Sequence, residues 1–134
     1  MNKALVVVLL ICVVIAVMLY QSGRDVATAK DTYQDEFIRM DIAPEQASAH
    51  TMKESAFTLT ISHMSGEPVI GASLEVVLSM PGMFCGSFPA KVTETKPGSY
   101  VAVGIPVMRG EWQAEAHLQT DYKTRRVIYP FIVN

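Results

Sequence analysis

Hydrophobic and polar residues follow two different patterns along this chain. Residues 4–20 form an unbroken apolar run without a charge, a proline or a glycine. Beyond residue 55, apolar and polar residues alternate with a period of two. A long apolar run favours a helix in an apolar environment, whereas alternation is typical of half-buried strands. The chain therefore predicts an N-terminal helix followed by a β-domain.

The run from Ala4 to Tyr20 predicts a transmembrane helix. At 1.5 Å per residue it would be about 25 Å long, at the short end of what crosses a bilayer. It is aliphatic all round and lacks the polar face of a surface helix, and Tyr20 stands where a ring would meet lipid headgroups. We expect residues 1–21 to anchor the chain in a lipid bilayer and the long C-terminal domain to be exported.

A cleaved signal peptide is the alternative to an anchor. Lys3 supplies a basic start, and Ala27-Thr28-Ala29 resembles a small-x-small cleavage site. Against it, the apolar run is longer than the usual 7–15 residues, and Ala29 lies well beyond its end. Cleavage would release a secreted binding module that begins at Lys30.

Residues 22–54 are predicted to be a connector because they are mainly polar and charged. Tyr33, Phe37 and Met40 have helical spacing, so a short helix over 27–40 is one expectation, with Pro44 preventing its continuation. A partly ordered stalk is the other. A first strand is expected around 49–52.

Residues 55–134 predict a single all-β domain. Phe57, Leu59 and Ile61 alternate with polar residues, as a half-buried strand requires. Turn signals separate this strand from further ones, expected at 74–78, 90–95, 100–105, 112–118 and 126–133. Short strands at this spacing predict an immunoglobulin-like antiparallel β-sandwich and leave no room for the helices of an α/β fold. Pro130 places the last strand at an edge or a bulge.

Composition and charge narrow the function. The 134 residues carry a formal net charge of -2 and are 50% hydrophobic, which suits one folded domain and gives no basic stripe for nucleic acid. The sequence contains no nucleophile elbow, no phosphate-binding glycine loop and no paired histidines at metalloprotease spacing. We therefore expect neither an enzyme nor a small-molecule substrate.

The segment from Ser79 to Gly86 carries the candidate chemistry. Met80, Met83 and Cys85 bring two thioethers and a thiol to one bend, and such soft donors select monovalent copper. His63 or Met108 is a possible further ligand. The competing interpretation is that these methionines fill gaps in the core. Cys85 has no intrachain disulfide partner because Cys12 lies in the apolar run; it is a metal ligand, a partner disulfide or a buried thiol.

Several short motifs together resemble the YtkA-like and FixH-like family. They are residues 66–72 (GEPVIGA), the following strand 74–78, the corner 80–83 (MPGM), the strand start 98–100 (GSY) and residues 108–112 (MRGEW). The resemblance spans about 55–133 together with the single N-terminal helix. This sequence departs from the pattern at Cys85, where many members carry a histidine, and it lacks the aromatic-rich start of FixH-like proteins.

The resemblance implies an immunoglobulin-like sandwich tethered to the bacterial inner membrane and facing the periplasm. It also implies a role in copper handling, or in assembly of a membrane metalloenzyme such as a haem–copper oxidase, with an integral membrane protein complex as the partner. The alternative function is a metal-free structural subunit of a membrane complex.

Overall fold

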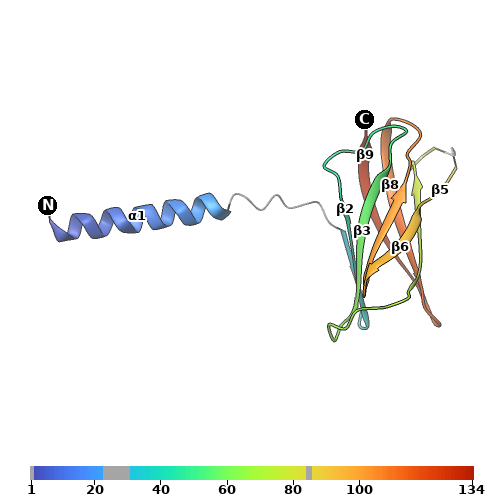
Figure 1. Ribbon diagram of the computed structural model, residues 1–134, viewed down its shortest axis with the longest axis horizontal. Helices are drawn as coiled ribbons and strands as arrows, with labels where there is room; N and C mark the ends of the chain where they lie inside the picture. Colours follow the sequence, from blue (N-terminus) through green and yellow to red (C-terminus); the bar gives the residue numbers. More distant parts are fainter. Residues whose placement is uncertain (1, 23–30, 84–85) are drawn as a thin grey trace.

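The computed structural model describes residues 2–22, 31–83 and 86–134 (Figure 1). One helix precedes a domain built from strands. The elements are α1 (Lys3–Ser22), β1 (Asp31–Gln34), β2 (Ile38–Pro44), β3 (Ser55–His63), β4 (Ser73–Ser79), β5 (Phe88–Pro89), β6 (Lys91–Lys96), β7 (Ser99–Gly104), β8 (Gly110–Gln119) and β9 (Thr124–Val133).

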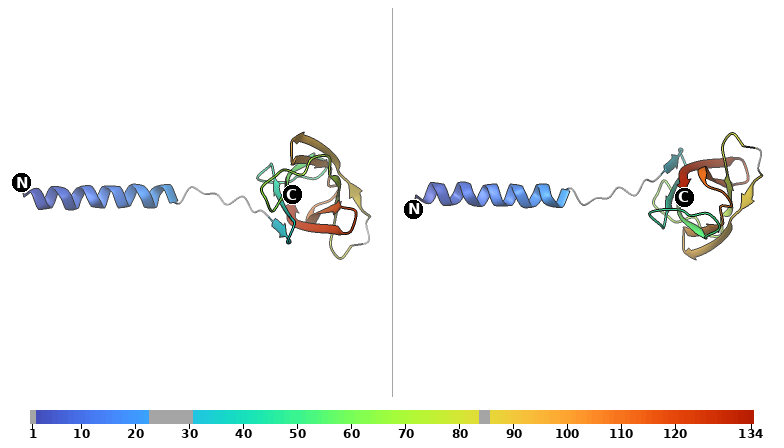
Figure 2. Two further views of the ribbon diagram at one scale, coloured as in Figure 1. Left: turned by 90° about the horizontal axis from the view of Figure 1, so that it is seen from below. Right: turned by 90° about the horizontal axis from the view of Figure 1, so that it is seen from above.

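The strands form two antiparallel sheets that pack as a β-sandwich. One sheet has the order β1-β2-β3-β7-β6 and the other has the order β5-β4-β8-β9. Views along the strands show the two layers enclosing the core (Figure 2). The predicted β-sandwich is confirmed, and β9 lies at the edge of its sheet, as Pro130 requires.

The core is made by the residues that alternate along the predicted strands. On β3, Phe57, Leu59 and Ile61 are at most 1% exposed, and on β8 every second residue from Trp112 to Leu118 is buried. Trp112 is among the largest fully buried side chains. Period-two alternation therefore locates both the strands and the faces that they bury.

The structure corrects the sequence analysis in the segment before residue 55. The expected helix over 27–40 is wrong for its described part, because residues 31–40 lie in β1, its hairpin and the start of β2. Ile38, Met40 and Ile42 point into the core and pair with β3, so burial favours a strand there. The expected strand at 49–52 is also wrong: this segment turns, and only Ala49 makes a bridge, to Val133.

The predicted N-terminal helix is confirmed as α1, but its prediction as a transmembrane span is not supported. No helix in the described part of the chain is long and apolar enough to cross a membrane. Between Leu5 and Val17 the aliphatic side chains of α1 are 42–60% exposed.

A tyrosine fastens the long connection between β3 and β4 to the sandwich. The hydroxyl of Tyr100 on β7 donates a hydrogen bond to the Val69 carbonyl (2.7 Å) and accepts one from the Ala72 N–H (2.9 Å). Burial, and then the neighbouring carboxylate of Glu94, raise the pKa of Tyr100, so the hydroxyl keeps its proton. The connection therefore has a fixed path although it contains no strand among 64–72.

We predict that Tyr100→Phe lowers the free energy of unfolding by about 1–2 kcal/mol, because the Val69 carbonyl and the Ala72 N–H lose their partner. Urea unfolding measures this change. Tyr122→Phe is the matched control, since Tyr122 is 97% exposed. A loss no larger than that of the control would contradict the prediction.

Candidate functional site

The four predicted metal-binding residues that the structure describes do not gather at one place. Met80 follows β4 and Met108 precedes β8, at the end of the sandwich where Gly110 pairs with Val133. His63 ends β3 at the opposite end, where it lines a groove with Thr120. The ten residues of β8 separate the two ends by about 33 Å. His63 is therefore too far from Met80 and Met108 to share an ion with them.

Met80 points into the core. It is 9% exposed and belongs to the hydrophobic cluster around Trp112. Its Cε lies under Gly110, where an added Cβ would come within 2.9 Å, and Gly110 has a φ of 133°. Only glycine suits this combination of left-handed backbone and close approach. Met80 thus secures the 80–83 corner to the start of β8 by packing.

Met83 and Met108 present their side chains at the surface. They are 47% and 41% exposed, and the Met83 N–H donates a hydrogen bond to the Met80 carbonyl (3.3 Å). The carbonyl of Met108 accepts a hydrogen bond from the Trp112 indole N–H (2.9 Å), so the largest core side chain holds the Met108 loop. Cys85 lies outside the described residues. Across the described ranges, His, Cys, Asp and Glu form no group of three or more suited to a metal ion.

Met52 occupies the same end and was missed by sequence reasoning. Its side chain is 68% exposed, and its N–H donates a hydrogen bond to the Pro106 carbonyl (2.8 Å). Met52 has a φ of 61°, the only positive φ of a non-glycine residue among those described. The sequence offers a weak signal, a methionine in a polar connector, and nothing that places it beside residue 106.

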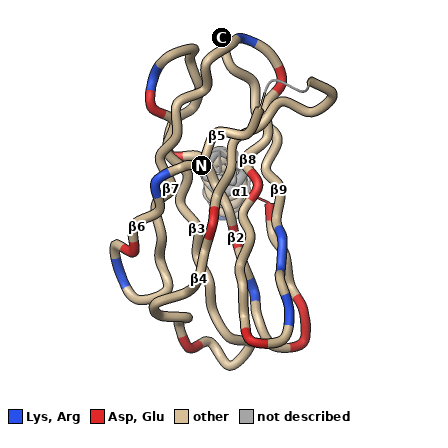
Figure 3. The backbone as a smooth tube through the Cα atoms, turned by 90° about the vertical axis from the view of Figure 1, so that its right-hand side faces the viewer, with Lys and Arg blue, Asp and Glu red and all other residues tan. Residues whose placement is uncertain are grey.

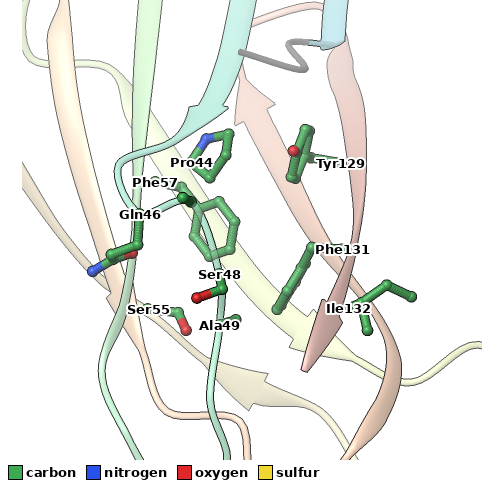
Figure 4. Close-up of a pocket in the computed structure, with 10 residues that line it drawn as sticks. Pro44, Gln46, Ser48, Ala49, Ser55, Phe57, Tyr129, Phe131 and Ile132 are labelled. Carbon is green, nitrogen blue, oxygen red and sulfur yellow. The ribbon is translucent and has the colours of Figure 1, made fainter. Parts of the chain in front are cut away.

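A small pocket opens at this end between β9 and the segment that follows β2 (Figure 4). Its volume is about 140 Å³. Phe57, Tyr129 and Phe131 form its aromatic wall, with the Phe57 and Phe131 ring centres 5.1 Å apart. Ser55 also lines it; this residue is 3% exposed, and its hydroxyl has no hydrogen-bond partner within the described structure.

We predict that Ser55→Ala raises the free energy of unfolding by about 1 kcal/mol, because a buried hydroxyl without a partner costs desolvation energy. Urea unfolding tests this against Ser73→Ala, an exposed position on β4. A loss of stability would contradict the prediction and show that the hydroxyl has a partner, such as a bound water.

An ion pair organises the opposite end of the sandwich. Asp35, in the β1–β2 hairpin, accepts N–H hydrogen bonds from Phe37 (2.8 Å) and Ile38 (2.9 Å). It also accepts a hydrogen bond from Arg125 Nε on β9 (2.5 Å), and Arg125 is 7% exposed. Acidic and basic segments lie side by side here, at the foot of β2 and β9 (Figure 3). The two N–H donors, and then Arg125, hold the pKa of Asp35 well below its ordinary value.

We predict that this carboxylate makes stability sensitive to acid. Because the pKa of Asp35 is lower in the folded state, its contribution is full above the unfolded pKa near 4 and is lost as the pH falls further. Asp35→Asn should be less stable at pH 7, since Arg125 loses its charged partner, and should lose less stability on acidification. Thermal unfolding between pH 7 and 3 measures both effects. Exposed Asp121→Asn is the control, and parallel profiles of Asp35→Asn and wild type would contradict the prediction.

Comparisons with known proteins define the fold and no more. Searches with protein-family models and among curated proteins found no match to the chain. The structure is similar to a DUF4785 family protein from Legionella pneumophila, with a TM-score of 0.59 and 14% identity over 72% of this chain and 29% of that one. It is also similar to domains 4 and 5 of the S-layer protein SbsC, with a TM-score of 0.50 and 14% identity over 78% of this chain and 53% of that one.

A filamin domain of Lin-41 is a weaker structural neighbour, with a TM-score of 0.49 and 9% identity over 78% of this chain and 91% of that domain. At such identities the likeness is remote and shows the β-sandwich fold alone. The chain spans about a third of the length of the DUF4785 family protein and about half of the SbsC chain. The sandwich expected from the YtkA-like and FixH-like resemblance is present, but no family is assigned.

Proposed function

We propose that this protein is a membrane-attached accessory protein that acts in copper handling or in the assembly of a membrane metalloenzyme, such as a haem–copper oxidase. The observation that carries the proposal is the exposure of two thioethers, Met83 and Met108, at one end of a rigid sandwich. Thioethers are soft ligands that favour Cu⁺ over hard cations. No enzymatic step is proposed.

The ligand set of this proposal differs from the one expected from sequence. Met83 and Met108 supply donors, and Met80 supports the corner from below. Cys85, two residues beyond Met83, is kept as a proposed ligand because a thiolate is also a soft donor. His63 is left out because it belongs to the other end.

Attachment to a membrane complex is proposed from the surface of α1. Its aliphatic side chains are exposed, and in water each would cost about 1.5–3 kcal/mol relative to burial. An integral membrane protein complex in its lipid bilayer offers the apolar surroundings that would cover this helix. By the resemblance noted in the sequence, the sandwich faces the periplasm of a bacterial inner membrane.

A metal-free structural subunit of a membrane complex is the second candidate function. Met80 favours it, because this side chain packs in the core. The opposite end of the sandwich also carries exposed apolar side chains, Phe37 at 66% and Tyr122 at 97%, of the kind that protein partners bury.

We predict that the full chain in detergent binds one Cu⁺ per molecule in an anaerobic competition titration with a chromogenic Cu⁺ chelator. The double variant Met83→Leu, Met108→Leu should bind at least about tenfold more weakly, the lower end of what even an outer-shell change costs a metal site. Met64→Leu is the matched control, since Met64 is also 47% exposed but follows His63 at the other end.

Purification from native membranes separates the two candidate functions. Copper in the isolated protein supports the first. Stoichiometric copurification with a large complex, without copper in this chain and without Cu⁺ binding in the titration, overturns the first and supports the structural subunit.

A further inference from the structure

Three exposed methionines lie at one end of the sandwich, on three different loops. Met52 lies between β2 and β3, Met83 between β4 and β5, and Met108 between β7 and β8. These loops lie at the end that carries the C-terminus (Figure 1). We propose that Met52 is a third thioether ligand of the Cu⁺ site, in the position that the sequence suggested for His63. This inference rests on the proposed function and adds Met52 to the ligands that were proposed there.

Backbone hydrogen bonds hold Met52 beside the loop of Met108. The Met52 N–H donates to the Pro106 carbonyl (2.8 Å), two residues before Met108. The neighbouring Thr51 N–H donates to the Asn134 carbonyl (3.0 Å), so the C-terminal end of β9 braces the same turn. The Trp112 indole fixes the Met108 carbonyl from the core side (2.9 Å). The backbone segments that carry Met52 and Met108 are therefore in contact.

The 80–83 corner joins this arrangement through Met80. The Cε atom of Met80 lies against Gly110, two residues after Met108, and the Met83 N–H is bonded to the Met80 carbonyl (3.3 Å). Met83 thus starts from a corner that is packed against the beginning of β8. A methionine side chain has three rotatable bonds, which gives its sulfur the freedom to turn toward a common ion.

The backbone of Met52 points to a use for its side chain. A left-handed φ of 61° is unfavourable for an L residue and suits glycine or asparagine, and methionine has no polar group with which to compensate. The turn keeps an exposed, strained methionine where a glycine would fold more easily. Such strain occurs at functional sites, where the surrounding structure holds the residue in place.

Three thioethers form an uncharged, soft ligand set. A thioether carries no proton that a metal must displace, so Cu⁺ affinity at such a site does not change between pH 5 and 8. A site that depends on a histidine or a thiol loses affinity as the pH falls. The pH dependence of Cu⁺ binding therefore distinguishes a thioether ligand from a histidine or a thiol ligand.

The test is the anaerobic Cu⁺ competition titration on the full chain in detergent, with Met52→Leu compared with Met64→Leu. We expect Met52→Leu to weaken Cu⁺ binding at least about tenfold at both pH 5.5 and pH 7.5, because a thioether carries no proton, and Met64→Leu to leave binding unchanged at both. Met52→Gly is a second variant: it relieves the positive φ, so it should raise the unfolding temperature while it still weakens Cu⁺ binding.

Two outcomes overturn the inference and are distinct from each other. If wild type binds Cu⁺ and Met52→Leu binds it as tightly as Met64→Leu does, Met52 is not a ligand, while the proposed function stands. If wild type binds no Cu⁺, the proposed function fails together with its ligand. Weaker binding by both Met52 variants, with Met52→Gly at least as stable as wild type, supports the inference because a damaged fold cannot account for it.

Discussion

The burial of Trp112 between the two sheets is the interaction on which the rest of this molecule depends. Its ring, 1% exposed, fills the core between β8 and the facing strands, and its N–H is satisfied by the Met108 carbonyl (2.9 Å). A large buried ring contributes packing energy, and its polar edge requires a partner, so one residue fixes both the core and a loop. Pro106 in that loop accepts the Met52 N–H, and Gly110 beyond it covers Met80. The candidate site is thus an extension of the core packing.

Much of the fold was predictable because the alternation of apolar and polar residues along each strand shows which of its faces is buried. Phe57, Leu59 and Ile61 alternate with polar residues, and so do the small residues after Trp112, since each strand has one dry face and one wet face. β2 was not predicted as a strand because Tyr33, Phe37 and Met40 have helical spacing. Over the same stretch, Ile38, Met40 and Ile42 alternate with other residues as a strand requires. Only pairing with β3 decides between the two periods, and a pairing partner is a tertiary fact.

The candidate site was less predictable because it depends on which loops share an end. His63 and Met108 both terminate strands, and nothing in their sequence neighbourhoods shows that β3 runs toward one end while β8 starts at the other. Met52 lies in a segment whose only conspicuous residues are polar, and its position follows from hydrogen bonds to Pro106 and to the distant C-terminus. Spacing identified the Met80–Met83 corner because its residues are neighbours in the chain. Residues brought to one end of the sandwich by long-range contacts leave no such signature.

Met80 and Met83 show that the same residue type can serve two purposes: Met80 packs in the core, and Met83 is exposed at the surface. The inward faces of the strands are occupied by core side chains, so a thioether on a strand or directly after it becomes packing, as Met80 does beneath Gly110. A thioether three residues further on, beyond the bend at Gly82, is released from the core and reaches the surface. A soft-metal site on this sandwich therefore has to be assembled from loops. The core holds the two loops that display Met108 and Met83, one through Trp112 and the other through Met80.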